Sequence, residues 1–163
     1  MKEKRIYLVI HGEIFSQVPD SGLTSTGIKQ MELIKNDLPI HPSFIISGTG
    51  KRHLQSADIL ELNVNRYSEI VESGVMMISI LGKSYCLLPR GCLIPLDKYL
   101  NGFDYEKQCL QAMIQELPDK TIIIGGQLTA TRLNHSAPPA PSVLLLESQE
   151  NSNFMRLSQM ISY

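Results

Sequence analysis

The stretch Ile6-Tyr7-Leu8-Val9-Ile10-His11-Gly12-Glu13 decides the fold of this 163-residue chain. Its first half is apolar and contains β-branched and aromatic side chains, which is typical of a buried strand. The strand stops at a histidine and a glycine, and the glycine allows a tight turn there. Because open α/β sheets bind ligands at the carboxyl ends of their strands, we expect a functional site at His11.

Further apolar runs alternate with amphipathic segments along the chain. The sequence predicts strands over residues 5–10, 43–47, 121–124 and 142–146, and helices over 24–37, 51–62, 104–117 and 153–161. Short apolar segments between residues 69 and 97 predict two or three small strands. Helices between buried strands favour a three-layer α/β fold, in which helices cover both faces of a mostly parallel central sheet.

Three of these strands end in glycine-rich or polar loops, at His11-Gly12, Gly48-Thr49-Gly50 and Gly125-Gly126. Parallel strands bring such ends to one edge of the sheet. The second loop leads into Lys51 and Arg52 at the start of a helix, an arrangement of amides and cations that favours an anion. The alternative is a basic helix start that only faces solvent.

Two phosphate-binding motifs are excluded by their own requirements. A nucleotide-binding loop needs a glycine where Ile45 stands and a serine or threonine where Arg52 stands. None of the three cysteines is followed by the arginine that protein tyrosine phosphatases need. The four histidines show no pairing at helical spacing, so we expect no metal site and no cofactor. His41 and His53 are interpreted as surface or packing residues.

Composition limits the partners and the location. The net charge is −1, so we expect no nucleic-acid partner. The apolar runs are far shorter than the roughly 20 residues of a membrane span, so no membrane partner is expected either. No cleavable leader is visible, and we expect a cytoplasmic protein. The length favours a single domain over residues 1–163.

Three short motifs occur in order: Ile6 to Glu13, Leu23-Thr24-Ser25-Thr26-Gly27, and Arg52-His53-Leu54-Gln55-Ser56-Ala57. Together they resemble the histidine phosphatase, or phosphoglycerate mutase-like, superfamily. Its signatures are a strand ending in R-H-G-E, then L-T-x-x-G and R-x-x-Q-T-A, each opening a helix. The resemblance implies a phosphoglycerate mutase-like fold, with residues 83–101 as a small cap or hairpin insertion.

The resemblance also implies a mechanism and site residues. His11 would be the nucleophile that forms a phosphohistidine, and Arg52, Gly12 and Lys51 would bind the phosphoryl group. Glu69 or Glu72 would protonate the leaving group, and no motif decides between them. The alternative for either glutamate is a solvated charge at the edge of a strand.

Two positions depart from the family pattern. Ile10 stands in place of an arginine, and Gly125 stands in place of a second histidine. One donor to a developing oxyanion contributes about 3 kcal/mol, or roughly 10²- to 10³-fold in rate. A cation such as Lys51, Arg132 or Arg5 could compensate for part of the loss.

Two hypotheses follow. The first is a histidine-phosphatase-like protein with an anion pocket at His11 and Arg52 and with weak or lost phosphatase activity. The second is an active phosphatase that acts through a phosphohistidine. Under either hypothesis the partner is a phosphorylated small molecule, a phosphoprotein or an inorganic anion.

Overall fold

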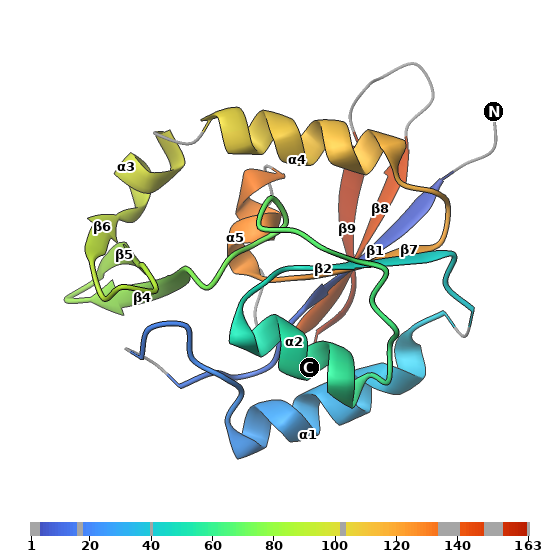
Figure 1. Ribbon diagram of the computed structural model, residues 1–163, viewed down its shortest axis with the longest axis horizontal. Coiled ribbons are helices and arrows are strands. Elements are labelled where there is room, and N and C mark those ends of the chain that lie inside the picture. The colour runs from blue at the N-terminus through green and yellow to red at the C-terminus, as the bar shows by residue number, and fades with distance from the viewer. Residues whose placement is uncertain are drawn as a thin grey trace.

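The computed structural model describes residues 4–15, 18–39, 41–101, 104–133, 141–148 and 155–162. Its centre is a six-stranded sheet in the order β3-β2-β7-β1-β8-β9 (Figure 1). The strands are β1 (Arg5–Ile10), β2 (Phe44–Ser47), β3 (Arg66–Tyr67), β7 (Thr121–Gly125), β8 (Ser142–Ser148) and β9 (Met155–Ser162). Strands β3, β2, β7 and β1 are parallel, whereas β8 and β9 are antiparallel to their neighbours. The mostly parallel sheet is therefore confirmed.

Helices cover both faces of this sheet, which confirms the three layers. On one side lie α1 (Ser25–Ile34), which continues into a 3-10 turn (Lys35–Asp37), and α2 (Lys51–Ile59). On the other side lie α4 (Asp104–Glu116) and α5 (Gln127–Arg132) (Figure 1). None of the helices in the described part of the chain is long and apolar enough to cross a bilayer.

The alternation of side chains along β1 supplies both halves of the core. Ile6, Leu8 and Ile10 are completely buried in one cluster with side chains of α4, such as Leu110. Val9 belongs to the opposite cluster, beneath α1 and α2. Burial of one such side chain contributes about 1.5–3 kcal/mol. The position of β1 in the sheet therefore follows from its apolar pattern.

The entry into α1 is fixed by a cap at Thr24. The side chain of Thr24 accepts a hydrogen bond from the Gly27 amide at 3.1 Å. Replacement of such a cap by alanine costs about 1 kcal/mol. This cap sets where the chain turns back onto the sheet after the loop that follows β1.

Residues 76–101 form a second, smaller unit. The strands β4 (Met76–Ile80), β5 (Lys83–Leu87) and β6 (Leu93–Pro95) make an antiparallel sheet, and α3 (Leu96–Asn101) follows it. The turn between β4 and β5 has positive φ at Leu81 and Gly82, as a two-residue hairpin requires. The small strands expected in this region are therefore present.

The expected helix at residues 153–161 is wrong. Its last seven residues belong to β9, which pairs antiparallel with β8, and residues 153 and 154 lie outside the described residues. The physical reason is the free edge of β8, whose backbone groups gain hydrogen-bond partners when another strand is added. Local apolar spacing gives no information about such an edge.

Candidate functional site

The carboxyl ends of three neighbouring strands meet at one edge of the sheet. The amide of His11, just after β1, donates to the carbonyl of Gly125 at the end of β7, at 3.4 Å. On the other side of β7, the amide of Gly48 donates to the carbonyl of Ile124 at 2.8 Å. The loops that the sequence placed at one edge are therefore adjacent.

His11 has a different partner at each ring nitrogen. Nδ1 lies 2.8 Å from the carbonyl oxygen of Gly12 and so carries the proton, whereas Nε2 accepts from Nε of Arg52 at 3.1 Å. Burial, followed by the charge of Arg52, lowers the pKa of His11 from 6.5 to about 4. His11 is therefore neutral near pH 7, and its Nε2 lone pair accepts the Arg52 N–H; to act as a nucleophile, Nε2 would first have to release this hydrogen bond.

Arg52 lies in the first turn of α2 and links His11 to a carboxylate. Its Nη2 donates to Oε1 of Glu72 at 2.7 Å and to the carbonyl of Val75 at 2.6 Å. Its Nη1 is buried and has no hydrogen-bond partner among the residues described. The guanidinium therefore already has an anion next to it, and it keeps one donor free.

The structure separates the two candidate glutamates. Glu72 is only 2% exposed, and its Oε2 accepts from the Thr129 hydroxyl at 2.8 Å. Its backbone carbonyl accepts from the Thr49 amide, which holds this segment against the loop after β2. Glu69 is exposed. The solvated-charge interpretation is therefore wrong for Glu72, which lies in the site.

The sequence did not predict the position of His53. This side chain is completely buried, and its ring lies edge-on to that of His11, with 5.8 Å between the ring centroids. Its Nδ1 accepts from the Gly50 amide at 3.0 Å and so caps α2. The one available signal was its place beside Arg52, in the first turn of the same helix.

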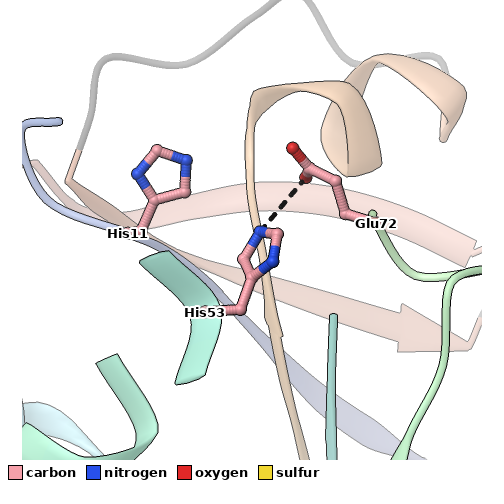
Figure 2. A group of neighbouring side chains, drawn as sticks. All are labelled: His11, His53 and Glu72. Carbon is pink, nitrogen blue, oxygen red and sulfur yellow. Dashed lines mark ion pairs between the residues drawn. The ribbon is translucent and has the colours of Figure 1, made fainter. Parts of the chain in front are cut away.

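Possible ligand atoms of His11, His53 and Glu72 lie within 4.8 Å of one another, a spacing that is compatible with a metal ion (Figure 2). The hydrogen bonds of the two imidazole rings are not compatible with one. The Gly50 amide occupies Nδ1 of His53, so Nε2 carries a proton, and the Arg52 guanidinium already donates to Nε2 of His11. Metal-bound imidazoles need these lone pairs free, and a nearby guanidinium repels a cation. These residues do not form a metal site in this arrangement.

Gly12 and Lys51, the other residues expected to bind phosphate, have different surroundings. The carbonyl of Gly12 faces His11, and a Cβ on Gly12 would lie 2.6 Å from the Gly27 carbonyl oxygen, so this turn needs a glycine. Lys51 is exposed, and its backbone amide donates to Asp20. Lys51 is therefore at the rim and Gly12 is in the interior.

Comparison with known proteins gives a structural likeness and no sequence match. The sequence matches no protein-family model and no curated protein. A protein of Thermus thermophilus, TTHB049, superposes with a TM-score of 0.66 at 14% identity, covering 97% of this chain and 99% of that one. Rv3214 of Mycobacterium tuberculosis superposes with a TM-score of 0.62 at 15% identity, covering 95% of each chain.

A third similar structure is a candidate alpha-ribazole-5'-P phosphatase of Escherichia coli. It superposes with a TM-score of 0.66 at 14% identity, covering 98% of this chain and 97% of that one. The chain has the histidine phosphatase fold. Since the identities are low, the likeness concerns the fold, and the chemistry must be argued from the residues themselves.

Within the histidine phosphatase fold, Ile10 occupies an apolar environment. Its side chain is completely buried in the cluster that contains Leu8 and Val71, on the face covered by α4. An arginine there would place its charged group among aliphatic side chains. The apolar side chains around position 10 therefore suit an isoleucine and do not suit a phosphate-binding arginine.

At Gly125, the second position that differs from the family pattern, the neighbouring side chains leave no room for a Cβ atom. A Cβ at position 125 would lie 2.6 Å from Oγ1 of Thr129, and a Cβ at Gly126 would lie 2.5 Å from Oε2 of Glu72. Thr129 and Glu72 thus fill the space that side chains at these positions would take.

The other two cations suggested by the sequence, Arg5 and Arg132, have different surroundings. Arg5 begins β1, at the end of the strand opposite His11. Arg132, at the end of α5, donates from Nη2 to the Tyr99 hydroxyl at 3.2 Å, and its guanidinium lies over the Tyr99 ring. The charges of Arg52 and Glu72 cancel, and the two histidines are neutral, so this group of four has no net charge.

Proposed function

We propose that this protein binds the phosphoryl group of a small phosphoester or a phosphoprotein at His11 and Arg52, and that it hydrolyses such esters only slowly. The observation that carries the proposal is the 3.1 Å contact between Nε of Arg52 and Nε2 of His11, with Nδ1 of His11 held by Gly12. A guanidinium in contact with a neutral imidazole supports the pairing of phosphate binding with nucleophilic attack.

The chemistry would proceed in two displacements. Nε2 of His11 releases the Arg52 N–H and attacks phosphorus, the bond from phosphorus to the ester oxygen breaks, and the leaving oxygen takes a proton from Glu72, which must be in its protonated form for this step. Water then attacks phosphorus, the bond from phosphorus to Nε2 breaks, and the water gives a proton back to the Glu72 carboxylate. The second step releases inorganic phosphate and restores neutral His11.

The same contacts explain why turnover would be slow. Nη2 of Arg52 is engaged by Glu72, and in that ion pair the carboxylate is charged and has no proton to donate. A bound phosphoryl group must compete with Glu72 for the guanidinium. The donors missing at Ile10 and Gly125 would together cost on the order of 10⁴- to 10⁶-fold in rate, if their effects add.

One structural neighbour fits this class of reaction. The Escherichia coli protein is named as a candidate phosphatase of alpha-ribazole-5'-P, which is a phosphomonoester. The likeness supports phosphomonoesters as the first compounds to test and leaves the alcohol portion of the substrate open.

The test combines binding and turnover in the purified protein. We expect inorganic phosphate to bind, by calorimetry, and an aryl phosphate to be hydrolysed slowly. Both signals should be lost in Arg52→Ala, and hydrolysis should be lost in His11→Ala. His41→Ala is the matched control, because His41 is exposed and lines a different surface hollow, with Tyr7 and Lys120.

Two results would overturn the proposal. One is a folded protein that binds no phosphate. The other is hydrolysis that persists unchanged in His11→Ala. Acid-labile phosphate trapped on the unaltered chain, and missing from His11→Ala, would support the phosphohistidine directly.

A further inference from the structure

His53 has a buried polar atom whose role the proposed reaction does not explain. The side chain is completely buried, and its Nε2 has no hydrogen-bond partner in the described part of the structure. Oε2 of the Glu72 carboxylate lies 3.9 Å from this atom, beyond hydrogen-bond length (Figure 2). Buried polar groups without partners are rare in folded proteins and often mark a ligand site.

The hydrogen bond at the other ring nitrogen determines what Nε2 can do. Because Nδ1 accepts from the Gly50 amide, the single proton of the neutral ring is on Nε2. Burial, and then the charges of Arg52 and His11, lower the pKa of His53 well below 6.5, so the ring stays neutral at pH 7. Nε2 is therefore an N–H donor with no acceptor among the residues that the structure describes.

This donor faces the nucleophile. Nitrogen atoms of His11 and His53 and a carboxylate oxygen of Glu72 lie within 4.8 Å of one another. The free Nη1 of Arg52 is a second buried donor without a partner in the described residues. A group that enters beside His11 and carries several acceptor oxygens would satisfy an N–H that is otherwise orphaned.

We propose that the Nε2–H group of His53 donates a hydrogen bond to a phosphoryl oxygen of a group bound at His11. His53 would thus supply a neutral donor at the edge where Gly125 offers none. The inference rests on the function proposed above. His53 keeps its proton throughout, so no bond forms or breaks at its ring.

Two substitutions separate this role from the capping role of the same side chain. In His53→Asn, the amide oxygen can replace Nδ1 as the acceptor for the Gly50 amide, but the distant N–H is lost. In His53→Gln, the amide nitrogen reaches about as far as Nε2 and restores an N–H donor. Unfolding in urea without ligand reports whether either variant has lost stability.

The probes are inorganic phosphate and orthovanadate, measured by calorimetry on the full chain. When a nucleophile such as His11 adds to orthovanadate, vanadium becomes five-coordinate and resembles phosphorus in the transition state, in which hydrogen-bond donors to the equatorial oxygens have their largest effect. We expect His53→Asn to bind orthovanadate about 100-fold more weakly and phosphate only a few-fold more weakly. His53→Gln should recover most of the difference. A role in folding alone would weaken both ligands equally or neither.

The outcomes distinguish this inference from the function on which it rests. If the unaltered chain binds phosphate in an Arg52-dependent manner, and stable His53→Asn binds orthovanadate equally well, the role of His53 is refuted alone. If the unaltered chain binds neither anion, both proposals are refuted. Loss of orthovanadate affinity in His53→Asn, with recovery in His53→Gln, supports the proposal that Nε2–H of His53 donates to the bound anion.

Discussion

Arg52 and Glu72 form an ion pair of 2.7 Å in which the two side chains are only 1% and 3% exposed. Removal of one partner of such a pair is strongly destabilising, because the other charge is left buried without compensation. The pair also places a carboxylate on the guanidinium that would bind phosphate. The same ion pair is therefore expected to affect both the free energy of unfolding and the affinity for phosphate.

We expect Glu72→Gln to lower the free energy of unfolding by about 3 kcal/mol, because the buried charge of Arg52 loses its partner. Phosphate should bind this variant more tightly than the unaltered chain, since no carboxylate competes for the guanidinium. Added phosphate should then restore part of the lost stability. Urea unfolding with and without phosphate measures both effects.

Glu69→Gln is the control for this substitution. It makes the same chemical change three residues away on an exposed side chain, so stability should change by less than about 0.5 kcal/mol. Equal effects at positions 69 and 72 would contradict the role given to the ion pair.

Placing an arginine at position 10, as in the motif that this segment resembles, should destabilise the protein and leave hydrolysis weak. Ile10 is completely buried among aliphatic side chains, so Ile10→Arg would bury a charge without a partner and cost about 4 kcal/mol or more. Ile10→Val, which removes one methyl group, should cost only about 1 kcal/mol. A stable Ile10→Arg variant with strongly increased hydrolysis would contradict the prediction that the apolar surroundings of position 10 cannot accommodate an arginine.

Gly125 and Thr129 should be energetically coupled. A Cβ at position 125 would lie 2.6 Å from the Thr129 hydroxyl, so Gly125→Ala should cost about 1–3 kcal/mol. Thr129→Ala removes that contact along with its own hydrogen bonds. The double variant should therefore lose at least about 0.5 kcal/mol less than the two single variants added together.

Thr131→Ala provides the comparison for this cycle. Thr131 lies in the same helix, and its hydroxyl donates to the Gln127 carbonyl at 2.8 Å. Gly125→Ala combined with Thr131→Ala should be additive in urea unfolding. Additivity in the Thr129 cycle as well would show that the contact at position 125 relaxes without cost.

Stability should fall in mildly acidic solution because of the site histidines. The pKa of His11 is lowered by burial to about 4 in the folded protein, against 6.5 when exposed, so the unfolded chain binds more protons between these values. The contribution of His11 is complete above pH 6.5 and is lost as the pH falls towards 4. It amounts to about 3 kcal/mol, and His53 acts in the same direction.

Urea midpoints between pH 7.5 and 4.5 measure this dependence. His11→Ala should flatten the curve, whereas His41→Ala, which alters an exposed histidine, should leave it unchanged. A midpoint that does not move over this range in the unaltered chain would show that the two rings gain protons freely in the folded state.

The sequence by itself determined the framework of this protein. Uninterrupted apolar runs predicted the buried strands, amphipathic spacing predicted the helices, and the motif Leu23-Thr24-Ser25-Thr26-Gly27 predicted the start of α1. It also placed His11 and Arg52 at the same edge of the sheet. These features follow from local periodicity and from the rule that parallel strands share their carboxyl ends, so no distant contact was needed to infer them.

Only the tertiary structure decided which groups surround His11. It selected Glu72 over Glu69, brought His53 into the site and turned the expected last helix into β9. Each outcome depends on a partner distant in sequence: the Arg52 guanidinium, the His11 ring or the free edge of β8. Local spacing predicts which residues can be buried, but the partners of a buried charge or an open strand are known only once the whole chain is packed.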